Sequence, residues 1–272
     1  MPVIGDYQDI HVTLEQCVGA VTIQRPPFNY FDHNLICAIA DAFDDLDKRD
    51  DCRAIVLAAE GKAFCAGAIL GGDNAINKEN PGDAKSGESA FKRRSGTLYG
   101  EAVRLFSNKK PVVCAVQGAA IGGGLGLSLV GDFRVTCSEA RFSSNFTRLG
   151  IHPGFGLSHT LPALIGQQKA RLMFYSGRRI KGEQAYAWGL ADEIVPQAEV
   201  LGAATALATE IADSAPLAVQ SIRATVRRGL ADRVRMATDH ELNEQEWLLK
   251  TADAKEGITA TAERRMPAFR NK

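Results

Sequence analysis

The sequence has no excess of charge of either sign. Lys and Arg together number 32, as do Asp and Glu, so the formal net charge is zero. A protein that holds nucleic acid or a membrane surface through a strongly cationic body needs a clear excess of Lys and Arg. The balance therefore argues against both kinds of partner, although it leaves open a local basic cluster for a phosphorylated cofactor.

The six cysteines form neither a CxxC pair nor a spacing typical of metal ligands. Scattered cysteines of this kind are typical of reduced thiols in a cytosolic enzyme, so we expect no bound metal. The first residues lack the basic and apolar stretches of a signal peptide. No apolar run is long enough to span a bilayer. The sequence therefore predicts a soluble, cytoplasmic protein.

Nucleotide-binding fingerprints are absent as well. The glycine cluster at residues 122–124 is not followed by the Gly-Lys-Ser/Thr of a P-loop. It also lacks the acidic residue that a dinucleotide fingerprint places after the next strand. A glycine cluster is costly in backbone entropy. It makes sense at a helix start, where the N–H groups and the helix dipole face an anion.

What the sequence does contain is two stretches rich in Gly and Ala. They span residues 62–70 and 119–126, and each follows a short apolar run with β propensity, at 54–59 and 111–116. Strands that end in small residues let the backbone itself approach a ligand. Two such turns can direct two N–H groups at one developing oxyanion. We therefore predict an anion site formed by main-chain amides.

The order of the elements predicts an α/β fold. Two alternating β-branched runs at residues 10–14 and 18–23 indicate a hairpin, and Asp32 is placed to cap a helix that reaches about residue 48. Strands then alternate with helices up to about residue 137. This alternation favours parallel β-structure with crossover connections.

From residue 167 onward the pattern becomes helical almost throughout. We therefore expect a β/α core over residues 1–200 and a helical region over residues 201–272. The later helical segments are predicted at residues 198–213, 216–228, 233–250 and 253–265.

Further motifs lie before and after the two small-residue stretches. The chain has Ile-Gln-Arg-Pro-Pro-Phe-Asn at 23–29, a segment from Ala-Arg-Phe to Pro-Gly at 140–154, Lys-Glu-Gly at 255–257 and Pro-Ala-Phe at 267–269. Together the motifs resemble those of the crotonase (enoyl-CoA hydratase/isomerase) superfamily, and the resemblance covers nearly the whole chain. Members of that superfamily act on acyl-CoA thioesters.

This resemblance implies an α/β fold, namely a crotonase-like spiral of ββα units with a C-terminal helical trimerisation region. It implies acyl-CoA as the substrate, with CoA as part of that substrate and no separate cofactor. Because trimers of the family often pair, we expect a homotrimer or a homohexamer. The resemblance also assigns the N–H groups of Ala68 and Gly123 to the oxyanion hole that polarises the thioester carbonyl.

The positions of the family's acid–base residues carry no carboxylate here. Hydratases of the family use two glutamates, whose positions are Gly126 and Phe146 in this chain. Some relatives have an aspartate at the position of Gly154. We therefore expect weak or absent hydration of crotonyl-CoA. C–C bond hydrolysis, decarboxylation or thioester hydrolysis on the same fold remains open, as does an acyl-CoA-binding protein without catalysis.

His152 lies in the segment that usually supplies the base. Imidazole titrates near neutral pH and suits either donation or abstraction of a proton. We therefore take His152 as a candidate catalytic residue that carries a proton. The alternative is a structural histidine that is hydrogen-bonded to the backbone of its turn.

The resemblance also implies a set of substrate-binding residues. Arg25 matches one wall of the CoA site, and Ala66, Ile69 and Leu70 match the wall for adenine and pantetheine. Phe269 matches a C-terminal residue that reaches the ligand of a neighbouring subunit. The full set of predicted binding residues is Arg25, Pro27, Phe28, Ala66, Ile69, Leu70, Gly122, Asn145, Phe146, Gly154 and Phe269.

Overall fold

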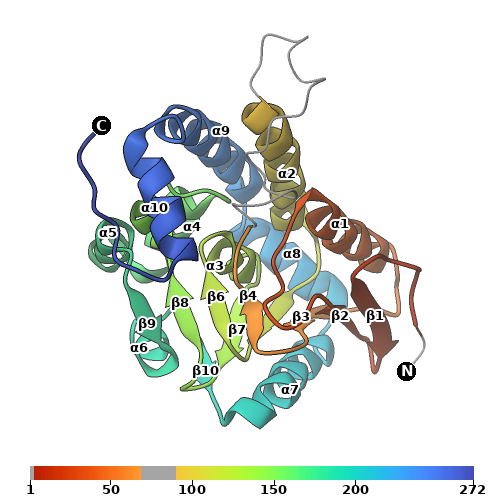
Figure 1. Ribbon diagram of the computed structural model, residues 1–272. Helices are drawn as coiled ribbons and strands as arrows, with labels where there is room; N and C mark the ends of the chain where they lie inside the picture. Colours follow the sequence, from red (N-terminus) through yellow and green to blue (C-terminus); the bar gives the residue numbers. More distant parts are fainter. Residues whose placement is uncertain (1–2, 69–89) are drawn as a thin grey trace.

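The computed structural model describes residues 3–68 and 90–272 of the chain (Figure 1). Two of the predicted binding residues, Ile69 and Leu70, lie outside the described residues. Within these two ranges, no helix is both long enough and apolar enough to cross a membrane.

The larger β-sheet of the described residues has six strands. In spatial order they are β1 (Ile10–Glu15), β2 (Val18–Ile23), β3 (Ala54–Ala59), β5 (Val112–Val116), β7 (Phe133–Thr136) and β10 (Glu193–Ile194). β1 and β2 form the predicted antiparallel hairpin, and the other neighbours are parallel. β3 and β5 are apolar along their whole length because they are buried on both faces.

The smaller sheet has four strands in the described part of the chain. In spatial order they are β4 (Ala63–Cys65), β6 (Ala119–Ile121), β8 (Arg141–Ser143) and β9 (Arg179–Lys181). β3, β5 and β7 of the larger sheet are followed by β4, β6 and β8 of the smaller one, so successive turns of the chain repeat one plan. Strands of three residues are too short to show a period of two, and the sequence pattern did not predict them.

The helices of the core connect the strands of the two sheets. They are α1 (His33–Asp47), α2 (Ala90–Ser107), α3 (Gly123–Ser128), α4 (Leu157–Ile165), α5 (Gln167–Ser176), α6 (Gly182–Ala187) and the 3₁₀ helix η2 (Asn145–Leu149). Asp32 Oδ1 accepts a hydrogen bond from Leu35 N at 3.0 Å, so Asp32 caps α1 as predicted. The stretch after residue 167, expected to be helical almost throughout, also contains the short strands β9 and β10.

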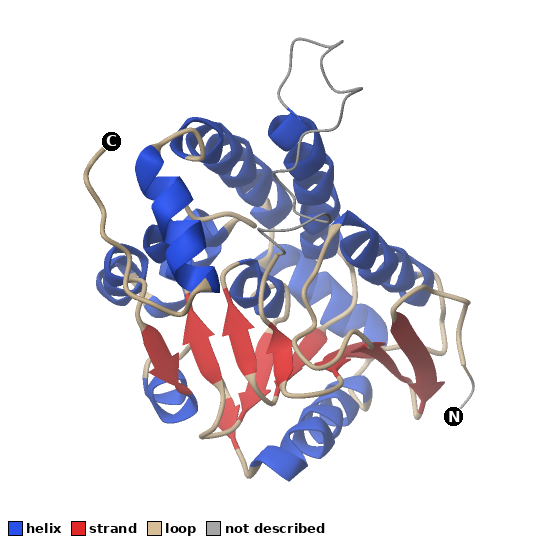
Figure 2. Ribbon diagram, in the orientation of Figure 1, coloured by secondary structure: helices blue, strands red, loops and turns tan. Residues whose placement is uncertain are grey.

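The C-terminal part of the chain is helical, as predicted. Its helices are α7 (Val200–Ala212), α8 (Pro216–Val226), α9 (Leu230–Leu248) and α10 (Ala252–Ala262). α7 lies on the side of the large sheet opposite to α1, α2 and α9, and it buries Ala204 and Ala208 (Figures 1 and 2). α9 packs along α2, and α10 packs on η2. The boundary between core and helical region at residue 200 stays a prediction.

Candidate active site

The first small-residue loop leaves β4 and passes between two other segments. Ala66 N donates to Phe28 O at 2.9 Å, and Phe31 N donates to Gly67 O at 3.0 Å. Gly67 has a φ of +95°, in the left-handed region that favours glycine. A methyl group at Gly67 would lie 2.9 Å from Ile121 O. The loop is therefore held by the segment after Phe28 on one side and by β6 on the other.

The second small-residue loop joins β6 to α3. Gly122 has a φ of +56°, and its N–H donates to Ser143 O at 2.8 Å. α3 begins at the next residue, Gly123. A methyl group at Gly124 would overlap the carbonyl oxygen of Cys65 and lie 2.7 Å from its carbonyl carbon. The backbone of α3 therefore lies directly against the end of β4, and only glycine allows this contact.

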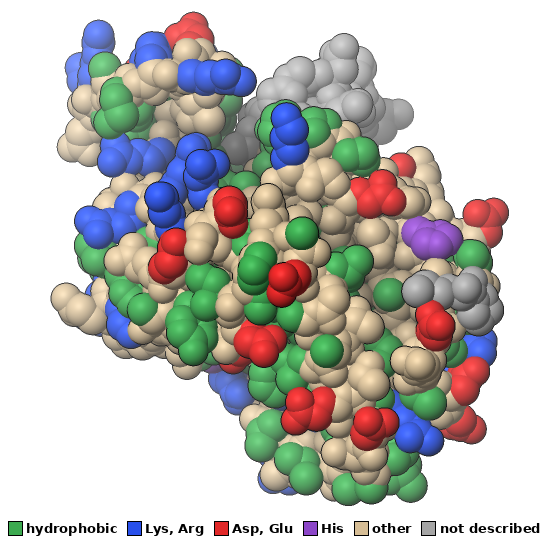
Figure 3. Space-filling view, turned by 90° about the horizontal axis from the view of Figure 1, so that it is seen from below, with side chains coloured by type: hydrophobic (Ala, Val, Ile, Leu, Met, Phe, Trp, Pro, Cys, Tyr) green, Lys and Arg blue, Asp and Glu red, His purple; other side chains and the backbone are tan. Residues whose placement is uncertain are grey.

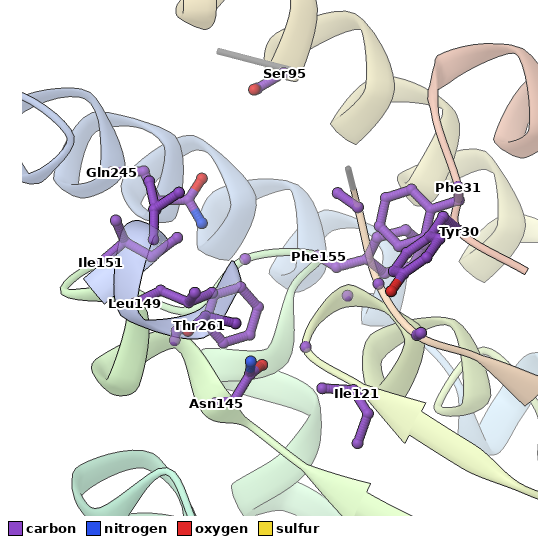
Figure 4. A pocket seen from close by; sticks show the side chains of 18 of the residues that line it. Tyr30, Phe31, Ser95, Ile121, Asn145, Leu149, Ile151, Phe155, Gln245 and Thr261 are labelled. Carbon is purple, nitrogen blue, oxygen red and sulfur yellow. The ribbon is translucent and has the colours of Figure 1, made fainter. Parts of the chain in front are cut away.

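The two loops meet in the wall of one cavity with a volume of about 530 Å³. Figure 4 shows Ile121 and Asn145 at one end of this cavity and Ser95 at the other. Apolar side chains make up much of the wall, namely Phe31, Phe91, Leu98, Phe146, Leu149, Ile151 and Phe155. A cavity of this size and character is typical of a site for a small organic ligand.

Two main-chain amides of the small-residue loops in this wall face no acceptor among the described residues. They are the N–H groups of Ala68, in the first loop, and of Gly123, at the start of α3. The first N–H groups of a helix have no partner within the helix and lie at the positive end of its dipole. Two amides of this kind, from loops that touch, can together bind one oxygen that gains negative charge during a reaction.

Known proteins carry the same arrangement of elements. Residues 13–272 match the family model described as Enoyl-CoA hydratase/isomerase. The chain belongs to the enoyl-CoA hydratase/isomerase family. Carnitinyl-CoA dehydratase from Salmonella typhi is 33% identical to this chain over 272 residues, and the match covers 97% of this chain and 99% of that protein.

Solved structures of this family share the fold. Enoyl-CoA hydratase/isomerase from Pseudoalteromonas atlantica T6c has a TM-score of 0.81 at 28% identity, covering 97% of this chain and 100% of that chain. An enoyl-CoA hydratase from Mycobacterium avium subsp. paratuberculosis K-10 has a TM-score of 0.81 at 25% identity, covering 98% and 100%. The predicted crotonase fold is thereby confirmed, with two mixed sheets and C-terminal helices.

The crotonase fold brings many of the predicted site residues together. Those that line the cavity are Ala66, Ala68, Gly122, Gly123, Asn145, Phe146 and Gly154. Those that lie outside the described lining are Arg25, Pro27, Phe28, His152 and Phe269.

Aromatic side chains occupy the space at both positions where crotonase hydratases have a glutamate. A methyl group at Gly126 would lie 2.8 Å from Phe155 Cβ, so a longer side chain has no room there. Phe146 is 8% exposed and lines the cavity. Its ring reaches the second loop, since a methyl group at Gly122 would lie 3.7 Å from Phe146 Cζ. An apolar surface therefore replaces the carboxylates.

The third carboxylate position, Gly154, faces two polar side chains from helices. A methyl group at Gly154 would overlap the Tyr99 hydroxyl and lie 2.7 Å from Gln245 Nε2. Tyr99 on α2 donates its hydroxyl hydrogen to Gln245 Oε1 on α9 at 2.8 Å. Burial raises the pKa of Tyr99, so the phenol stays protonated at neutral pH. Both residues were missing from the predicted site, because in sequence they are ordinary positions of amphipathic helices.

His152, the candidate proton carrier, packs behind the cavity wall. Its Nδ1 lies 2.9 Å from Pro153 O, and its ring packs edge-on against His240 with the centroids 5.7 Å apart. Its carbonyl oxygen accepts a hydrogen bond from Gln245 Nε2 at 2.9 Å. Burial lowers the pKa of His152, which favours the neutral imidazole. A role for this residue in proton transfer stays a prediction.

Arg25, Pro27 and Phe28 lie in the segment that supports the first loop. Arg25 Nη2 lies 2.6 Å from Asp9 Oδ2, and Arg25 Nη1 lies 2.9 Å from Asp32 Oδ1. The two carboxylates balance the charge of this guanidinium and fix the turn. Phe28 O accepts a hydrogen bond from the first loop, and Pro27 O accepts one from the residue just before β4. Their contact with CoA stays a prediction.

Phe269 lies in the segment after α10 and is 42% exposed. Ala268 N donates to Glu256 Oε1 at 2.7 Å, and Arg270 N donates to Asp253 Oδ1 at 2.7 Å. Two carboxylates of α10 therefore hold this segment on both sides of the phenyl ring. Contact of Phe269 with the ligand of a neighbouring subunit stays a prediction.

Proposed function

We propose that the protein acts on acyl-CoA thioesters and stabilises an enolate oxygen with the N–H groups of Ala68 and Gly123. One observation carries this proposal: both amides lack a described acceptor, and both belong to the wall of the same cavity. Loss of one donor of an oxyanion hole costs roughly 3–4 kcal/mol in transition-state stabilisation. Membership of the crotonase family supports CoA thioesters as the substrate class.

The proposed reaction forms the enolate by decarboxylation of a malonyl-type thioester, in which the bond between the α carbon and the carboxylate breaks and CO₂ leaves. The described lining of the cavity contains no His, Asp or Glu. Hydration and thioester hydrolysis both need an activated water, for which this lining offers no ordinary base. When CO₂ leaves, the electrons of the broken C–C bond pass to the thioester carbonyl, so no water is activated and no proton is removed from the α carbon. The oxyanion hole alone then supplies the main stabilisation.

The enolate must afterwards gain a proton, and we propose Tyr99 as its donor, after its hydroxyl hydrogen leaves Gln245 Oε1 and turns to the enolate. Tyr99 lies in the cavity wall and remains protonated because burial raises its pKa. The bond to Gln245 Oε1 holds the phenol in place next to Gly154. His152, which lies behind the wall, is the alternative carrier.

Two cations support the binding of a phosphorylated ligand such as CoA. Arg179 on β9 and Arg264 after α10 line the cavity, and neither forms an ion pair with a described residue. Basic side chains also gather on the left of the view in Figure 3, although the net charge of the chain is zero. The two arginines of the lining are therefore available to a phosphate group of the ligand.

Dehydration of a hydroxyacyl-CoA is the second candidate. The observation that favours it is the 33% identity to a protein named carnitinyl-CoA dehydratase over almost the full length of both chains. Turnover of carnitinyl-CoA, with no turnover of malonyl-type or β-keto thioesters, would select this reaction over the first. Tight binding of CoA esters without turnover of any of them would indicate a binding protein.

Crotonyl-CoA is expected to be a poor substrate. Without the two glutamates, the hydration turnover number should fall below about 1 s⁻¹, the lower end of the common range for enzymes. Loss of the absorbance of the conjugated thioester measures this rate directly. A turnover number well inside the common range for enzymes would contradict the expected loss of crotonyl-CoA hydration.

The predicted assembly into a homotrimer or homohexamer is part of the same proposal. α8 carries apolar side chains that are exposed in the single chain, with Leu217 at 80%, Ile222 at 63% and Val226 at 74% exposed. Exposed apolar side chains on one helix support burial against another subunit.

A further inference from the structure

Ser95 is a polar side chain inside the apolar part of the cavity wall. It lies on α2, lines the cavity and is only 1% exposed. Its hydroxyl has no hydrogen-bond partner among the described residues. Burial of a hydroxyl without a partner is unfavourable, because the group loses its bonds to water and gains none in return.

Six other Ser and Thr residues in the described helices behave differently. A hydroxyl in a helix usually returns its hydrogen to the carbonyl oxygen four residues earlier. The side chains that form this bond here are Ser107, Thr160, Ser176, Thr205, Thr209 and Thr225. Ser95 forms no such bond to Phe91 O. Its hydroxyl hydrogen is therefore available to a group in the cavity.

The position of Ser95 places it far from the two amides. Figure 4 shows Ser95 at the end of the cavity opposite to Ile121 and Asn145, which adjoin the second small-residue loop. An acyl group whose carbonyl lies at that loop would extend along the cavity toward Ser95. The surrounding wall is apolar, so at this end of the cavity the Ser95 hydroxyl is the group that can recognise a polar atom of the acyl chain.

Tyr99 and Gln245 do not compete for this role. Tyr99 follows Ser95 by one helical turn, on the same face of α2. Its hydrogen is already donated to Gln245 Oε1, and Gln245 Nε2 donates to His152 O. Ser95 is thus the member of this group whose hydrogen is unused.

We propose that the acyl group of the CoA ester carries an oxygen, as a hydroxyl or a carbonyl, that accepts a hydrogen bond from Ser95. The substrate class is then a hydroxyacyl- or oxoacyl-CoA with its oxygen away from the thioester, in place of a plain alkyl chain. This proposal rests on the proposed function, because it requires the thioester to bind at Ala68 and Gly123.

Calorimetric titration with a matched ligand series tests the proposal. The ligands are hexanoyl-CoA and the four hydroxyhexanoyl-CoA isomers that carry the hydroxyl on carbons three to six. With the wild-type protein, at least one isomer should bind about tenfold more tightly than hexanoyl-CoA, the usual size of one hydrogen bond. Ser95→Ala should lose this preference and bind hexanoyl-CoA at least as well as the wild type does.

Ser107→Ala is the matched control on the same helix. Its hydroxyl is already bonded to Val103 O at 3.1 Å, so this variant should keep the preference. If hexanoyl-CoA binds and no isomer binds better, or if the preference survives in Ser95→Ala, the proposal for Ser95 is wrong while the proposed function stands. If no CoA ester binds at all, both proposals fall.

Discussion

Gly124→Ala is expected to lower the free energy of unfolding by more than about 4 kcal/mol, or to prevent folding. The added methyl group would overlap the carbonyl oxygen of Cys65 and lie 2.7 Å from its carbonyl carbon. Gly124 and Cys65 are both buried, and the oxygen and carbon atoms that the methyl group would meet belong to the backbone of Cys65. No side-chain rotation can relieve the overlap in a close-packed interior, so α3 and β4 must separate.

Gly202→Ala provides the control for this substitution. Gly202 lies inside α7, and an added methyl group would meet no atom within 4 Å. Alanine should therefore stabilise the helix by about 0.5–1 kcal/mol. Urea unfolding of both variants gives the comparison. A Gly124→Ala protein within about 1 kcal/mol of the wild type would show that the two loops are not in backbone contact.

Glu241→Gln is expected to change how stability depends on pH. Glu241 on α9 is buried and caps the start of α4. Its Oε2 accepts from Gly156 N at 2.8 Å, and its Oε1 accepts from Ser158 N at 2.8 Å and Ser158 Oγ at 2.6 Å. Burial nevertheless raises the pKa of this carboxyl from 4.5 to about 7.

The direction of the effect follows from the two pKa values. Between pH 4.5 and about 7 the folded protein keeps a proton on Glu241 that the unfolded chain releases. The contribution of this group to stability is therefore present below pH 4.5 and is lost as the pH rises to about 7. At 1.36 kcal/mol per pKa unit, the loss amounts to roughly 3 kcal/mol.

Free energies of unfolding measured across this pH interval check the prediction. The difference between wild type and Glu241→Gln should change by up to roughly 3 kcal/mol over the interval, because glutamine does not titrate. Glu210→Gln, on the exposed face of α7, should run parallel to the wild type. Parallel profiles for the wild type and Glu241→Gln would show that Glu241 is ionised throughout.

The two small-residue loops could be predicted from the sequence because of how closely backbones approach each other there. Where two backbones touch, only glycine fits, and such positions stand out in composition. Gly67 and Gly124 lie at such contacts, and Gly122 adopts a positive φ of +56° that also favours glycine. The apolar strands and the capped helix after Asp32 were equally visible, since their patterns are local.

The rest of the site depends on contacts between distant segments. The missing carboxylates at Gly126 and Gly154 could be read from the sequence, but their replacements could not. Phe155 fills the space beside Gly126, and Tyr99 with Gln245 fills the space beside Gly154. These partners come from other elements, and their own local patterns resemble those of any buried helix or turn residue.

The carbonyl stretching frequency of a bound thioester tests the central claim most directly. Crotonyl-CoA labelled at its carbonyl carbon can be observed by infrared difference spectroscopy on the protein, without any turnover. If Ala68 N–H and Gly123 N–H both bind the carbonyl oxygen, the stretch should appear at lower frequency in the complex than in water. A bound ester whose carbonyl absorbs at the same or a higher frequency than in water would contradict the account.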